Sequence, residues 1–234
     1  MTKRFGFTLA EVLITLGIIG VVAAMTIPTL VKNYQKTVWV NQLKKSVSTI
    51  EQGFQKMMAD DGVTKLEDTE LGLLLLNENF GRGWGYSDMC TTEEINTVND
   101  ILKKYFNIVK FGDKRFCKDF LMKDADQEKC WDGDTAYPIY LTDGTAIAFE
   151  YLFSPVLKQL HDYYGDILID VNGDKGPNQW GRDAFAFKVT KQGLINSYNA
   201  GIYGCKNPGE AVSEEAAGYD CAARIIKAGW KMDY

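Results

Sequence analysis

The sequence has few of the residues from which catalytic and metal-binding sites are usually built. Its 234 residues include one histidine, His161, and contain no CxxC, HExxH or GxxxxGK[ST] motif. No nucleophile, histidine and acid can be grouped from these residues, so we predict that the protein is not an enzyme and that His161 is structural. Basic residues are not in excess either. With 26 Lys and Arg against 31 Asp and Glu, the net charge of −5 gives no reason to expect a nucleic-acid partner.

Charge is missing altogether from one long stretch near the N-terminus. The 20 residues of 12–31 carry no charged side chain, and Glu11 is the only charge between Phe7 and Val31. As a helix, 20 residues span roughly 30 Å, which is about the hydrocarbon thickness of a bilayer. Averaged over the whole chain, the composition is ordinary for a globular protein, with 46% apolar and 24% charged residues.

Three interpretations of this stretch compete. The apolar run is too long for a cleaved secretory signal, and Val22-Ala23-Ala24 continues directly into further apolar sequence. An uncleaved single-pass anchor fits the length, but it leaves the carboxylate of Glu11 unexplained inside a membrane helix. Basic residues flank the run on both sides, so charge alone does not decide its orientation.

The third interpretation explains Glu11. The string KRFGFTLAE at residues 3–11 resembles the start of type IV prepilins and type II secretion pseudopilins. In that family a prepilin peptidase cuts after the Gly of a short basic leader, the new N-terminal Phe is N-methylated, and the fifth mature residue is Glu. The resemblance therefore implies cleavage after Gly6, methylation of Phe7 and a specific role for Glu11. As a hypothesis, the ammonium of a neighbouring subunit pairs with Glu11 and fixes the register of assembly.

The resemblance extends into the helix that follows. Gly20 and Pro28 stand where the family has its helix-softening residues, although glycine and proline are also common in membrane helices generally. Beyond the run, apolar residues at steps of three or four predict one continuing helix of about 50 residues that ends at Asp60-Asp61-Gly62. We therefore divide the chain into a leader, a membrane or filament-core half-helix, a packed half-helix and an exported α+β domain, at residues 1–6, 7–31, 32–61 and 62–234.

The outer domain combines helix and strand patterns. Thr91 with Glu94 predicts a capping box before an amphipathic helix, and a second helix is expected at 216–228. Alternating segments separated by short turns predict strands at 137–141, 145–152, 166–171, 184–190 and 194–198. The fold class is α+β: a long N-terminal helix against an antiparallel sheet of four or five strands. This is also the architecture of pilins.

Five cysteines lie outside the apolar run, and no two have the close spacing of a zinc site. In an exported domain disulfides are expected, whereas a cytoplasmic domain would keep five reduced thiols. The most local pairing is Cys117–Cys130 and Cys205–Cys221, with Cys90 left over. The second bond would staple a C-terminal loop, as disulfides of pilins often do.

One loop carries oxygen side chains at alternating positions, as the first half of an EF-hand does. They are Asp170, Asn172, Asp174, Gly176, Asn178 and the late Asp183. The loop departs from an EF-hand because Lys175 replaces the turn glycine and Gly181 replaces the final glutamate. Major pseudopilins have a similar calcium-binding loop, so Ca²⁺ is the predicted cofactor. The alternative is an Asx-turn loop that joins two strands without metal.

The sequence therefore predicts a filament subunit of a type IV pilus or a type II secretion pseudopilus. Its expected partners are further copies and other pilins, the prepilin peptidase, the inner-membrane assembly machinery and membrane lipid. The expected location is the bacterial inner membrane, crossed once with the globular domain exported, and then a periplasmic or extracellular filament. A minor pilin whose outer domain binds a ligand and an uncleaved anchor for an exported domain are the alternatives.

Overall fold

The computed structural model describes residues 8–75, 92–112, 138–150, 163–193, 195–196, 205 and 216–234. These residues fall into two compact units, Met1–Val38 and Trp39–Tyr234. Helix α1, Leu9–Asp60, supplies the described helix of the first unit and the first helix of the second. Its 52 residues agree with the predicted helix of about 50, and Pro28 lies inside it. The predicted functional division at residues 6, 31 and 61 stays a prediction.

In the second unit, α1 packs through the apolar stripe that its spacing predicts. Leu43, Val47, Ile50, Phe54, Met57 and Met58 of this stripe are buried; Trp39, its first predicted residue, is partly buried, and the neighbouring Val40 is buried. The helix ends where Asp60-Asp61-Gly62 predicts, because Gly62 takes a positive φ of 65° that glycine adopts without strain.

In the described residues, three short helices precede the sheet in the sequence and a fourth follows it. Shortly after α1 come η1, Leu66–Asp68, and α2, Glu70–Leu75. Helix α3, Thr92–Tyr105, is the expected amphipathic helix, although Thr91 of its predicted capping box lies outside the described residues. Helix α5, Ala216–Lys227, agrees with the prediction within one residue and packs against β5.

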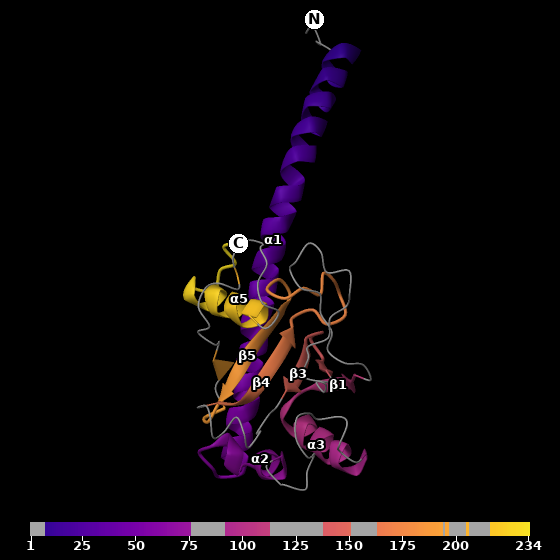
Figure 1. The fold of residues 1–234 in the computed structure, drawn as a ribbon. Coiled ribbons are helices and arrows are strands. Elements are labelled where there is room, and N and C mark those ends of the chain that lie inside the picture. Colours follow the sequence, from indigo (N-terminus) through magenta and orange to yellow (C-terminus); the bar gives the residue numbers. More distant parts are fainter. Residues whose placement is uncertain are drawn as a thin grey trace, which may run out of the picture. The chain divides into compact units, whose positions relative to one another are not determined.

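The described strands form one antiparallel sheet in the order β1-β2-β3-β4-β5-β6 (Figure 1). They are Ile108–Phe111, Pro138–Leu141, Ala146–Glu150, Tyr163–Asp170, Ala184–Thr190 and Ile195–Asn196. The predicted α+β architecture, with a long N-terminal helix and an antiparallel sheet, is confirmed. The structure adds β1, which sequence reasoning did not identify because its four residues are exposed or only partly buried and show no alternation.

The two faces of the sheet have different cores. Ile147, Ile167 and Phe187 lie in the cluster that α1, α3 and α5 share. The opposite face carries Ala148, Leu168 and Ala186 in register across β3, β4 and β5, with the Trp180 side chain packed beside them. Trp180 is 1% exposed, so its side chain is part of this core.

Candidate functional site

The first turn of α1 is closed by a reciprocal pair of side chains. The backbone N–H and the hydroxyl of Thr8 both donate to Oε2 of Glu11, each at 2.8 Å. In return, the Glu11 N–H donates to Oγ1 of Thr8 at 3.3 Å. This is a capping box, with Thr8 at the N-cap and Glu11 three residues later, and it satisfies two of the helix's unpaired donors. Helix α1 therefore begins at Leu9, two residues after Phe7.

The helix that follows this turn is exposed and apolar. From Val12 to Val31 every side chain is exposed except the partly buried Ala23. By length and composition alone, α1 is long and apolar enough to cross a membrane. The position of Gly20 is open, since no atom lies within 4 Å of where a Cβ would be. Of the residues predicted for processing, Glu11 lies at the helix start, whereas Gly6 and Phe7 lie outside the described residues.

The second candidate site is the loop between β4 and β5. Its three acidic side chains accept hydrogen bonds from the chain itself. Asp170 accepts from the N–H of Asn172 at 3.0 Å, and Asp183 accepts from the N–H groups of Asn178 and Gln179 at 2.9 and 2.7 Å. The Asp170 contact, to the N–H two residues on, is that of an Asx turn, whereas Asp183 reaches back to N–H groups four and five residues earlier.

The third acid of the loop turns to the edge of the sheet. Asp174 accepts from the hydroxyl of Tyr140 at 2.7 Å and pairs with Lys110 at 3.5 Å, while the Lys110 ammonium lies 3.9 Å from the centre of the Tyr140 ring. Within the described residues, no group of three His, Cys, Asp or Glu side chains could hold a metal ion. Ca²⁺ takes six to eight oxygen ligands, and backbone and amide carbonyls can supply some of them beside carboxylates.

The amide side chains of the loop differ from the acids in their hydrogen bonds. Oδ1 of Asn172 is buried without a hydrogen-bond partner, although its amide nitrogen donates to the carbonyl of Gly176 at 3.3 Å. The amide of Asn178 faces the carbonyls of Gly173 and Lys175, and its nitrogen donates to both when the amide is turned to satisfy them. Calcium binding by this loop stays a prediction.

Comparison with known proteins bears on the first site. A family profile described as the prokaryotic N-terminal methylation motif matches residues 1–27.

The chain carries a prokaryotic N-terminal methylation motif. This methylation motif is the signature of type IV pilins and pseudopilins, and it indicates a pilin-like precursor with an apolar N-terminal helix. It points to a structural subunit rather than an enzyme and is consistent with a membrane-anchored precursor. It also implies processing by a prepilin peptidase and assembly with other pilins. No curated protein and no solved structure showed significant similarity to the chain.

The structure describes two of the five cysteines. Cys205 and Cys221, 16 residues apart, form a disulfide, as their spacing predicts. Both are buried, at 2% and 0% exposed. The predicted Cys117–Cys130 pair, the leftover Cys90 and the single His161 lie outside the described residues.

Sequence reasoning missed the role of one residue within the methylation motif. Thr8 was not singled out, although the spacing Thr8-x-x-Glu11 is the same capping-box signal that was used for Thr91 and Glu94. The family resemblance drew attention to the carboxylate of Glu11 alone. The local helix-capping rule would have found its partner.

Proposed function

We propose that this chain is the precursor of a structural subunit of a type IV pilus or type II secretion pseudopilus. The prepilin peptidase cuts it after Gly6, Phe7 is N-methylated, and the subunit assembles through the first half of α1. The globular domain, with its Cys205–Cys221 disulfide, is exported, and the assembled filament is periplasmic or extracellular. The first half of α1 serves as the membrane anchor before assembly and as part of the filament core afterwards.

One observation carries this proposal: the methylation motif leads directly into an apolar helix face that the subunit itself leaves uncovered. Leu13, Ile18 and Met25 are 60%, 60% and 73% exposed. Contiguous apolar surface of this extent requires another environment. Lipid supplies it before assembly, and the same helix of neighbouring copies supplies it afterwards.

The contacts of Glu11 suggest how assembly is guided. Both hydrogen bonds from Thr8 end on Oε2, and no residue among 8–75 donates to Oε1. After cleavage, the ammonium of a neighbouring Phe7 can pair with this carboxylate while the capping box stays closed. A charge-assisted bond is stronger than a neutral one, and only one axial stagger of two helices allows it. The carboxylate then serves both helix capping and register.

The N-terminus of the native protein, extracted from membranes, tests the proposal. Intact mass and terminal fragmentation should give a chain that begins at N-methylated Phe7. A Gly6→Val variant, altered only at the predicted cleavage site, should keep its leader and remain unmethylated. A wild-type start at Met1 or Thr2 would mean an uncleaved anchor, and a cut near Ala24 would mean a secreted soluble domain. Either result would overturn the filament function.

A further inference from the structure

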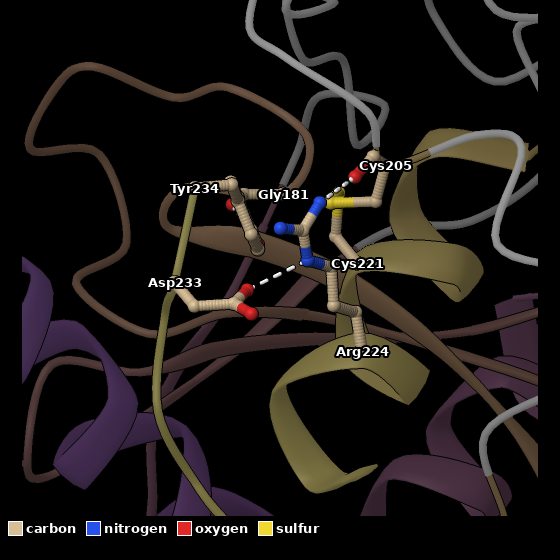
Figure 2. The surroundings of a disulfide bond; sticks show 6 residues. All are labelled: Gly181, Cys205, Cys221, Arg224, Asp233 and Tyr234. Atoms are coloured by element: carbon tan, nitrogen blue, oxygen red, sulfur yellow. Dashed lines mark hydrogen bonds and ion pairs between the residues drawn. A yellow bond between two sulfur atoms is a disulfide. The ribbon is translucent and has the colours of Figure 1, made fainter. Parts of the chain in front are cut away.

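Arg224 on helix α5 joins three segments of the chain (Figure 2). Its Nη1 donates to the backbone carbonyl of Cys205, and its Nε donates to Oδ1 of Asp233 at 2.6 Å. The guanidinium also lies 4.9 Å from the centre of the Tyr234 ring, a distance suited to a cation–π contact. One side chain therefore contacts the segment at residue 205 and the tail that follows α5.

The disulfide accounts for the position of the first of these contacts. Cys221 lies on α5 three residues before Arg224, so the two side chains stand on one face of the helix, about one turn apart. The bond from Cys221 holds Cys205 against α5. The Cys205 carbonyl is thereby fixed within reach of the Arg224 guanidinium, as Figure 2 shows.

The tail reaches in turn to the loop between β4 and β5. The hydroxyl of Tyr234 donates to the carbonyl of Gly181 at 2.6 Å. Burial raises the pKa of the Tyr234 phenol, so it remains a donor throughout the physiological range. Gly181 has a positive φ of 75° and lies two residues before Asp183, which accepts the N–H groups of Asn178 and Gln179. The contacts thus run without a break from the disulfide to the acidic loop.

We propose that residues 230–234, held by Arg224, form a C-terminal latch that closes only when Cys205 and Cys221 are oxidised. The two thiols lose two protons and two electrons to a disulfide-bearing oxidant, which becomes a dithiol, and one S–S bond forms. The Cys205 carbonyl is then in place to accept from Arg224, and Arg224 in turn fixes Asp233 and Tyr234. Through its hydroxyl, Tyr234 fixes the loop between β4 and β5. This inference goes beyond the filament function and does not depend on cleavage after Gly6.

Hydrogen-exchange mass spectrometry on the full-length protein in detergent micelles tests the order of these contacts. The probes are the amides of Trp230 and Lys231, which donate to the carbonyl of Ile225, and those of Asn178 and Gln179, which donate to Asp183. In the Cys205→Ser/Cys221→Ser variant we expect exchange in both groups to rise about tenfold, as local opening becomes easier. Unchanged exchange in the tail would overturn the latch.

Variants that keep the disulfide separate the latch from general loss of stability. Arg224→Gln should raise exchange in the tail and the loop, whereas Tyr234→Phe should raise it in the loop alone. Lys227→Gln is the matched control, since it removes the same charge from an exposed position of α5. Exchange within β4 should stay unchanged in all three. If the cysteine variant does not fold, the Arg224→Gln result decides, and wild-type exchange in its tail would reject the proposal.

Discussion

The ammonium of Lys45 lies 2.9 Å from the carboxylate of Asp143 and ties the turn between β2 and β3 to helix α1. Beside this pair, the hydroxyls of Ser46 and Thr145 share a buried hydrogen bond of 3.2 Å. Asp143 also accepts from the N–H of Thr145 at 3.1 Å. Burial raises the pKa of the Asp143 carboxyl, but the bonds from Lys45 and Thr145 outweigh it, so this pKa lies below its ordinary value.

A pH dependence follows from this lowered pKa. The folded state favours the ionised form, so Asp143 stabilises the fold above its unfolded pKa of about 3.9 and ceases to do so as the pH falls through the lower folded value. At pH 6, Asp143→Asn should lower the free energy of unfolding by about 0.5 kcal/mol. The value is small because the Lys45 side chain is largely exposed. In urea unfolding, the gap between the free energies of unfolding of the wild type and Asp143→Asn should close below about pH 3.9. A gap that persisted at lower pH would contradict the assignment.

The fold was largely predictable because its strongest signals are local. The stripe on α1, the short turn between the strands predicted at 137–141 and 145–152, and the helix at 216–228 each depend on periodicity or turn residues, and the structure places all three as expected. Strand β1 was missed for the opposite reason. Its side chains are exposed or only partly buried, and it is defined by pairing with β2, which sequence spacing does not reveal.

Close approach of α1 and the end of α3 provides a test of packing. At Gly53, a Cβ would collide with the ring of Phe106, which meets the Phe54 ring edge to face. Gly53→Ala gains roughly 1 kcal/mol of helix propensity but overpacks this contact, so we expect a net loss of about 1–2 kcal/mol in urea unfolding. Gln52→Ala, at the adjacent exposed position, is the control. A more stable Gly53→Ala protein would show that the helices can move apart.

The sheet carries a nearly buried ion pair on the face opposite α1. Lys188 and Asp166 are directly opposite in register, 3.1 Å apart, with side chains 13% and 11% exposed. Removing one partner leaves the other charge poorly solvated, so Lys188→Met should cost about 3 kcal/mol in urea unfolding. The double variant Asp166→Leu/Lys188→Met should recover most of that loss. If the double variant were instead less stable than Lys188→Met, the ion pair would be net stabilising.

Calcium binding by the loop at 170–183 is tested by melting the full-length protein with EGTA and with excess Ca²⁺. Agreement of the two melting temperatures within about 1 °C would favour the Asx-turn alternative, in which Asp170, Asp174 and Asp183 accept bonds from the chain itself. Binding at a hundredfold excess over Kd would instead raise the melting temperature by roughly 5–10 °C. In that case Asn172→Ala should abolish the rise, since its buried Oδ1 is the oxygen without a hydrogen bond.

The candidate site was less predictable than the fold. The prediction was incomplete at the start of α1 and at the loop between β4 and β5, for different reasons. Glu11 stood out because a charge in an apolar run is costly, but the energy of its capping partner is small and leaves no such mark. The acids of the loop matched a ligand spacing, yet spacing does not specify what each oxygen contacts. Asp183 caps two N–H groups of its own loop, a role that the sequence allows equally.

Substitutions at the helix start can separate the two roles of Glu11. Glu11→Leu removes both the capping oxygen and the charge, and it should abolish co-assembly with wild-type subunits while membrane insertion remains. Glu11→Gln keeps a capping-box acceptor for Thr8 but removes the charge. Thr8→Val does the reverse, since it keeps the carboxylate and removes the hydroxyl that donates to it.

The ion-pair hypothesis orders these variants. Because a neutral amide cannot form the charge-assisted bond to a neighbouring Phe7 ammonium, Glu11→Gln should assemble as poorly as Glu11→Leu. Thr8→Val should still assemble, with a helix start weakened by about 1 kcal/mol. The yield of sheared filaments, relative to the amount of subunit in the membrane, measures the effect. Wild-type yield from Glu11→Gln would mean that capping alone is required, and wild-type yield from Glu11→Leu would remove Glu11 from assembly altogether.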